Sequence, residues 1–208
     1  ITQLATPTVL LPNAGTLYVD LRAAHPSAST ATWTNLGTLG NFTRVGLPVL
    51  VNNVASTGIP GVSFSGSGQA YAGPNSPADI DGSGDRSIEV WAYNQSLVEE
   101  ETMVSWAHRG VDGRDMAFNF GSNGTWGAVT HWGGLYDVGW GTPPTANAWH
   151  HLVYTYTNNV TKVYVDGSLR NARTLGGSLN TYANEPINLA CQRDTANGNR
   201  SFYFSGYL

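Results

Sequence analysis

The run Trp149-His150-His151-Leu152-Val153-Tyr154-Thr155-Tyr156 and the following run Thr161-Lys162-Val163-Tyr164-Val165 decide the fold class. Both alternate with a period of two and are rich in Val, Tyr and Thr, which predicts two antiparallel strands. The short connection between them contains Asn158-Asn159 and is expected to turn the chain back on itself. Asp166-Gly167 then favours the positive φ angles of a two-residue turn, so a second hairpin should begin there.

Composition supports one β-rich domain. The chain has 208 residues, of which 25 are Gly and 10 are Pro, and only 12% are charged, which is typical of a turn-rich β-protein. No segment shows sustained helical periodicity, so we expect few helices. Strands are predicted at residues 16–21, 47–54, 61–65, 87–93, 102–108, 115–120, 126–132, 149–156, 161–165, 186–191 and 201–207.

Charge and hydropathy exclude two classes of partner. The formal net charge is -4 and no basic cluster is present, which argues against nucleic acid. No run approaches the roughly 20 apolar residues of a transmembrane helix, so no membrane insertion is expected. Cys191 is the only cysteine. It lies in an apolar strand and should be a buried, unreactive thiol.

Several motifs together resemble one family. They are Gly61-Val62-Ser63-Phe64-Ser65 with the glycine that follows, Ser87 to Tyr93, Thr102 to Arg109, and the hairpin from Trp149 to Gly167. This pattern is similar to laminin-G-like, concanavalin A-like jelly-roll domains. The resemblance implies an all-β antiparallel sandwich of two sheets packed face to face. It assigns residues 1–13 to a linker and residues 14–208 to the domain, with the last strand expected to be missing or truncated.

Catalytic motifs are not apparent. Glycosidases of this superfamily carry alternating carboxylates on one strand, whereas Glu99-Glu100-Glu101 is contiguous and predicted to be solvated loop charge. The chain has no Gly-x-Ser-x-Gly elbow, and no zinc-ligand spacing. Alternation allows only one of His150 and His151 to face the core. The chain is therefore expected not to be an enzyme.

Calcium is the best metal candidate. Asp79, Asp81 and Asp85 space oxygen ligands at alternate positions in a loop with Gly84 at the sixth position, as in the first half of an EF-hand-like loop. Many relatives in the resembled family hold a structural calcium in their edge loops. An Asp/Gly/Ser turn that needs no ion is the alternative interpretation of this loop, and Asp20 and Asp112 are weaker ligand candidates.

A candidate sugar site lies between Trp106 and Trp140, where four of the seven tryptophans gather among polar side chains. Sugars present apolar C–H faces and rings of hydroxyls, which aromatic platforms and planar polar groups bind. Trp132 or Trp140 is expected to stack on a sugar ring. The candidate residues are Trp106, His108, Arg109, Asn119, His131, Trp132, Asp137 and Trp140. The rival interpretations are that the tryptophans fill the core and that the polar groups only hold loops together.

The leading hypothesis is a non-catalytic carbohydrate-binding module of a larger secreted or cell-surface bacterial protein, whose other domains would be its neighbours. It would bind a glycan or polysaccharide, with calcium as a structural aid. A protein-contact adhesion domain is the alternative, and a large exposed apolar patch would favour it. A glycan-cleaving lyase or hydrolase is a third hypothesis, with His131 and Tyr136 as a conceivable acid–base pair.

Overall fold

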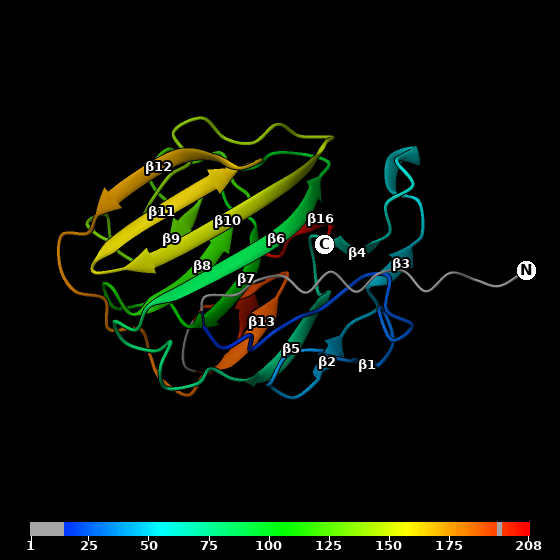
Figure 1. Ribbon diagram of the computed structural model, residues 1–208, viewed down its shortest axis with the longest axis horizontal. Coiled ribbons are helices and arrows are strands. Elements are labelled where there is room, and N and C mark those ends of the chain that lie inside the picture. The colour runs from blue at the N-terminus through cyan, green and yellow to red at the C-terminus, as the bar shows by residue number, and fades with distance from the viewer. Residues whose placement is uncertain (1–14, 195–196) are drawn as a thin grey trace, which may run out of the picture.

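The fold is a sandwich of two antiparallel sheets (Figure 1). The computed structural model describes residues 15–194 and 197–208, so the linker predicted at residues 1–13 lies outside the described residues. Each sheet has seven strands, and every pairing between neighbouring strands is antiparallel. The predicted all-β sandwich is confirmed.

The two sheets are called sheet A and sheet B, and sheet B faces the viewer in Figure 1. Its strands in spatial order are β12 (Ser168–Thr174), β11 (Val160–Val165), β10 (Trp149–Thr157), β6 (Arg86–Asn94), β16 (Ser205–Tyr207), β4 (Gly61–Ser65) and β3 (Val49–Val51). The C-terminal strand β16 pairs with both β4 and β6. The segment in which a last strand was expected to be missing or truncated therefore forms an inner strand of the sheet.

Sheet A lies behind it. Its strands in spatial order are β1 (Thr32–Trp33), β2 (Phe42–Val45), β5 (Ala70–Asn75), β13 (Pro186–Leu189), β7 (Thr102–Ala107), β8 (Asp115–Asn119) and β9 (Val129–Thr130). A small ribbon of β14 (Gln192–Arg193) and β15 (Arg200–Ser201) follows β13. The 3-10 turn η1 (Val54–Ser56) is the only helical element among the described residues, which thus contain no helix able to cross a membrane.

The hairpin that decided the fold class is present. Strand β10 pairs with β11, and the connecting Asn158 and Asn159 both have positive φ, 49° and 63°. Asp166 and Gly167, with φ of 51° and 76°, turn the chain from β11 into β12. Asn, Asp and Gly tolerate this left-handed backbone at little cost, so these two turns follow from the residue types.

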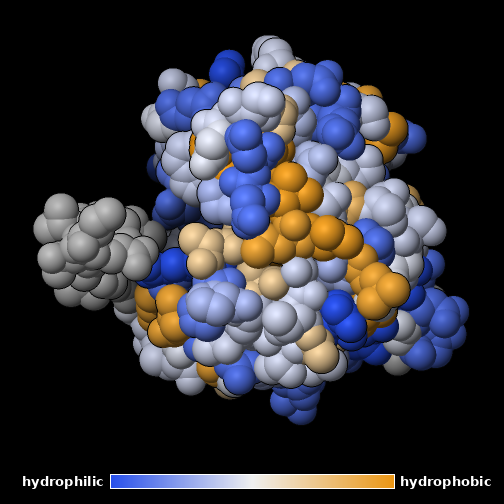
Figure 2. Space-filling view, turned by 90° about the vertical axis from the view of Figure 1, so that its right-hand side faces the viewer, coloured by the Kyte–Doolittle hydropathy of each residue, from blue (hydrophilic) through white to orange (hydrophobic). Residues whose placement is uncertain are grey.

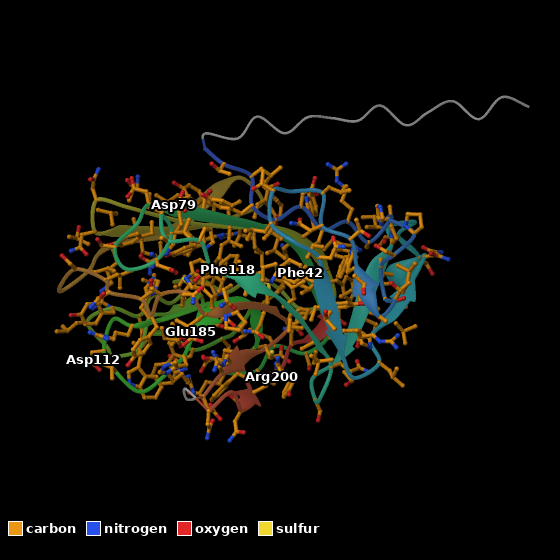
Figure 3. All side chains as sticks on the ribbon, turned by 90° about the horizontal axis from the view of Figure 1, so that it is seen from below. Phe42, Asp79, Asp112, Phe118, Glu185 and Arg200 are labelled. Atoms are coloured by element: carbon orange, nitrogen blue, oxygen red, sulfur yellow. The ribbon has the colours of Figure 1, made fainter. Side chains whose placement is uncertain are left out.

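Alternation along β10 places the core. His150, Leu152, Tyr154 and Tyr156 are buried, while the residues between them are only partly covered. The prediction that only one histidine of the pair faces the core is confirmed. His150 is buried and its ring packs against the buried Phe120, whereas the ring of His151 lies on the exposed Trp91. Figure 3 shows Phe42 and Phe118, from β2 and β8, between the two sheets, and both are fully buried.

Several predicted strands differ from the structure. The strand predicted at 47–54 is reduced to β3, and the one predicted at 201–207 is split between β15 and β16. Residues 16–21 form no strand, because the side chain of Asn35 binds their backbone: its amide donates to Tyr18 O, and its Oδ1 accepts from Asp20 N. The strand predicted at 126–132 shrinks to β9. Conversely, β1 and β2 lie in a region without a strand prediction, and they are only two and four residues long.

The end of the molecule that carries β3 and η1 shows an apolar band (Figure 2). Strand β3 is the edge of sheet B, and Val49 on it is 57% exposed. Leu47 just before the strand and Ile59 after η1 are also exposed. An edge strand with exposed apolar side chains is a feature that proteins often cover with a partner.

Replacing Gly206 in β16 by alanine tests the inner position of this strand. An added Cβ would lie 2.3 Å from the carbonyl oxygen of Tyr93 in β6, so the two strands must move apart. We expect a loss of about 1–3 kcal/mol in the free energy of unfolding, measured by chemical denaturation. Gly134→Ala is the matched control, because Gly134 has open space around it. Equal stability of the two variants would contradict the described pairing.

Candidate functional site

A pocket opens on the outer face of sheet A, and we call it the sheet A pocket. Thr130 lies in its floor: its neighbour Val129 is in the core, so by strand alternation Thr130 points outward. The pocket measures about 530 Å³, within the size range of small-ligand sites. Its lining residues are Glu99, Glu100, Arg109, Trp126, Thr130, Trp132, Gly133, Asp137 and Phe202.

Glu100 is the centre of a buried polar network beneath this pocket. One guanidinium nitrogen of Arg109, Nη2, donates to both of its carboxylate oxygens, at 3.0 and 2.7 Å. Gln192 Nε2 and Thr130 Oγ1 donate to Oε1 at 2.8 and 3.1 Å. The prediction of solvated charge is therefore wrong for Glu100 and for Glu101, which are buried. Both carboxylates find donors inside the protein, which is the condition for burying them.

Arg109 is held between two aromatic rings. Its Cζ lies 3.8 Å from the ring centroid of Phe202 and 4.9 Å from that of Trp132. Such cation–π contacts fix the plane of the guanidinium group. Trp132 has a φ of +66°, a backbone conformation that is costly for a bulky residue, and its carbonyl accepts from Gly113 N at 2.9 Å. The hydrogen bond from Gly113 thus holds the backbone of Trp132 in the conformation that directs its ring to the pocket.

Two further carboxyl groups lie near this network. Asp137 lines the pocket and accepts the backbone N–H of His131 at 2.9 Å, and burial raises the pKa of Asp137 to about 6. Asp115 is fully buried beneath the pocket, and burial raises its pKa well above the usual range. Its Oδ2 has no hydrogen-bond partner among the described residues, which a protonated carboxyl tolerates better than a charged one.

Three of the predicted sugar-site residues come together in the sheet A pocket: Arg109, Trp132 and Asp137. Asn119 lies directly behind them. It is fully buried, accepts from Thr102 Oγ1 at 2.8 Å and donates to Thr130. It supports the pocket floor and does not reach a ligand.

His108 lies outside this pocket. Its ring stacks on Tyr182 with centroids 4.1 Å apart, and its Nδ1 lies 2.8 Å from the carbonyl oxygen of Arg109. The histidine thus fixes the start of the segment between β7 and β8.

The other three predicted residues belong to the core, which corrects the prediction that they contact sugar. Trp140 is 1% exposed, donates from Nε1 to Gly127 O at 3.0 Å and packs on Phe118. His131 is fully buried against Tyr154, and burial lowers its pKa to about 3. Trp106 is 3% exposed. In each case the side chain fills space between the sheets and no surface remains for a ligand.

Sequence reasoning missed Glu99, Glu100 and Phe202 as lining residues. Glu100 looked like solvated loop charge, and only its hydrogen-bond partners from other segments reveal otherwise, whereas Glu99 is exposed and lines the pocket. Phe202 lies in the connection between β15 and β16, where no local pattern indicates a wall of a pocket. Trp126 was part of the aromatic-rich stretch but was not selected. The sequence places Trp126 in a predicted strand, whereas in the structure it is partly exposed in a turn before β9.

The loop predicted to bind calcium encloses an arginine. Arg86 Nη1 donates to the carbonyl oxygens of Ile80, Gly82 and Gly84 at 3.0, 3.3 and 3.1 Å. A guanidinium therefore occupies the ring of carbonyls that a cation would use, and Tyr156 covers it at 4.8 Å. This arrangement gives three backbone carbonyl oxygens of the loop a donor from the protein.

The three loop carboxylates bind three separate partners. Tyr18 OH donates to Asp79, Asn184 N to Asp81, and Thr157 Oγ1 to Asp85. No group of three or more His, Cys, Asp or Glu side chains in the described parts of the chain is arranged to hold a metal ion. The structure therefore gives each of the three carboxylates a separate protein donor, and calcium binding in the domain stays a prediction.

Thermal unfolding in excess CaCl₂ and in excess EDTA tests this assignment. Because Arg86 already donates to the loop carbonyls, we expect any difference in melting temperature between the two conditions to be the same in the wild type and in Asp81→Asn. Arg86→Met should lower the melting temperature strongly in both, since it leaves buried carbonyls without a donor. A calcium-dependent rise in the wild-type protein that Asp81→Asn removes would contradict the assignment, and would restore the predicted calcium site.

Comparisons with known proteins agree with this architecture. A laminin G-like sequence model of the concanavalin A-like lectin/glucanase superfamily matches residues 64–208, more than half of the chain. The chain belongs to this superfamily. The matched region contains the sheet A pocket and all the predicted sugar-site residues. No curated protein sequence matches the chain significantly.

Several solved structures share the fold of this concanavalin A-like domain, although their sequence identity to it is low. Domain 4 of an extracellular arabinanase from Geobacillus stearothermophilus, in complex with arabinotriose, is 14% identical with a TM-score of 0.54, covering 93% of this chain and 95% of that one. An arabinofuranosidase complexed with arabinofuranosyl-α-1,2-xylobiose is 14% identical, with a TM-score of 0.55, over 85% of this chain and 46% of that one. The binding domain of Paraclostridial Mosquitocidal Protein 1 is 12% identical, with a TM-score of 0.54, over 93% and 49%.

Proposed function

We propose that this domain is a non-catalytic carbohydrate-binding module of a larger secreted or cell-surface protein, and that the sheet A pocket holds a sugar unit of a glycan. The observation that carries the proposal is the pairing of tryptophan walls, Trp126 and Trp132, with charged hydrogen-bonding groups around one pocket. Aromatic faces bind the C–H face of a sugar, and Arg109, Asp137 and Glu99 supply donors and acceptors for its hydroxyls.

The rigidity of the site favours binding. Arg109 is fixed by Glu100, Phe202 and Trp132, so little side-chain freedom is lost when a ligand arrives. A preorganised site of this kind spends less of its interaction free energy on ordering.

The carboxylates of the pocket support a binding role over catalysis. Glu100 is buried and its two oxygens accept from Arg109, Thr130 and Gln192, so this carboxylate is engaged inside the protein. Asp137 is tied to the backbone N–H of His131. The acid–base pair considered for a lyase includes His131 itself, which is fully buried and cannot reach a substrate at the surface.

The neighbouring structures suggest which sugars to try first. Two of them are complexes with arabinose-containing ligands, one of which is arabinotriose. Arabinotriose is therefore the first probe, followed by a broad glycan array with calcium and with EDTA.

A protein-contact domain is the second candidate function. The apolar band at the β3 end, with Leu47, Val49 and Ile59 exposed, favours it (Figure 2). If the folded domain binds no glycan on the array, this second candidate function is supported instead.

Removing the tryptophan walls should abolish glycan binding. We expect Trp132→Ala and Trp126→Ala each to cost about 2 kcal/mol or more of binding free energy, because aromatic anchors dominate small interfaces. Titration calorimetry with the glycan found on the array measures this. Trp91→Ala is the matched control, since Trp91 is 56% exposed on β6 of the opposite sheet. Equal binding by all three variants would show that the pocket is misassigned.

Glycan affinity should also depend on pH through Asp137. With a pKa of about 6, its carboxylate is charged above pH 7 and accepts sugar hydroxyls, whereas protonation below pH 6 removes an acceptor. We therefore expect affinity to fall as pH decreases from 7 to 5, and Asp137→Asn to remove this dependence. Glu101, whose pKa burial raises to about 7, does not line the pocket, so Glu101→Gln should keep the profile. A profile unchanged by Asp137→Asn would contradict the role of this carboxylate.

A further inference from the structure

A second pocket lies at the end of the sandwich where the loops before β6, β8 and β13 meet, and we call it the loop pocket. It measures about 410 Å³. Its lining residues are Ala78, Asp81, Gly82, Arg114, Asn180, Thr181, Tyr182 and Ala183. One of its lining residues, Asp81, belongs to the loop that the sequence singled out for calcium, and the pocket shares no lining residue with the sheet A pocket.

Backbone hydrogen bonds join the three loops that form its walls. Gly82 and Thr181 bind each other through both backbone groups, at 3.1 and 3.2 Å. Asn180 N donates to Gly113 O at 2.9 Å, and Tyr182 N donates to Arg114 O at 3.0 Å. The walls are therefore fixed relative to one another, and the pocket is part of the folded structure.

Two charged side chains in the loop pocket retain unused binding capacity. Asp81 is only 7% exposed; its Oδ2 accepts from Asn184 N, while its buried Oδ1 has no hydrogen-bond partner in the described structure. Arg114 lies 5.0 Å over the ring of Tyr182 and forms no ion pair with any described carboxylate. Buried polar atoms are nearly always paired, so Asp81, which lines the loop pocket, keeps an acceptor oxygen that the described residues leave without a donor.

The two charges also define the class of ligand. An anion attracted by Arg114 would meet the carboxylate of Asp81, and a cation attracted by Asp81 would meet the guanidinium of Arg114. A neutral hydroxyl-rich ligand satisfies both, because a hydroxyl donates to a carboxylate and accepts from a guanidinium. The hydroxyls of a neutral sugar unit have this chemistry.

One segment of the chain separates the two pockets. Residues 108–114 connect β7 to β8, and Arg109 lines the sheet A pocket while Arg114 lines the loop pocket. Five residues span at most about 18 Å even when fully extended. Figure 3 shows Asp112 of this segment at the same end of the sandwich as Asp79 and Glu185, which belong to the loops flanking the loop pocket.

We propose that the loop pocket is a second subsite for the same glycan, holding a further neutral sugar unit, so that the domain recognises a chain and not a single residue. The proposal rests on the function proposed above. A ligand engaged at both pockets gains affinity through the second contact without a second association event.

The test compares ligands of increasing length in titration calorimetry. Arabinose, arabinotriose and longer arabino-oligosaccharides are the first series, replaced by the corresponding series of any other glycan that the array identifies. We expect wild-type affinity to rise with chain length. Asp81→Asn and Arg114→Ala should each weaken binding of the longest ligand about tenfold and leave that of the single sugar unchanged.

Two controls separate this proposal from the one on which it rests. Trp132→Ala should lose binding to ligands of every length. Asp85→Asn changes a carboxylate of the same loop that binds Thr157 and does not line the pocket, so it should bind as the wild type does. Wild-type affinity for long ligands in both Asp81→Asn and Arg114→Ala would overturn the second subsite alone. A wild-type domain that binds no glycan would overturn both proposals.

Discussion

The ion pair between Arg109 and Glu100 is the contact on which the arrangement of the sheet A pocket depends. It joins the loop before β7 to the segment after β7. The same guanidinium packs against Phe202, from the connection between β15 and β16, and against Trp132, from the connection after β9. Buried ions without partners are strongly destabilising, so the pair, Thr130 and Gln192 form one interdependent unit. Four segments far apart in sequence are thereby held in one geometry around a pocket.

The fold could be predicted because the strands of sheet B follow local rules. The alternation in β10 and β11 and the Asn158-Asn159 and Asp166-Gly167 turns need only neighbouring residues to be understood. The failures have a nonlocal cause. Residues 16–21 alternate like a strand, but their backbone binds the side chain of Asn35 and the backbone of residues 36–39 in place of a strand ladder.

The site was only partly predictable for a related reason. The sequence locates an aromatic and polar stretch, but not which face each side chain takes once strands end and loops begin. Trp132 and Trp140 look equivalent in the sequence, yet one lines the pocket and the other fills the core. Glu100 resembles its exposed neighbour Glu99, and only donors from β9 and β14 distinguish the two.

The inner position of β16 has a consequence for the order in which the domain is made. Strands β4 and β6 precede it in the chain by a long interval, yet β16 lies between them in sheet B. During synthesis on the ribosome the two halves of this sheet cannot be joined until Ser205–Tyr207 have emerged. Such nonlocal pairing slows folding, and it leaves the edges of β4 and β6 open to wrong partners until β16 has been made.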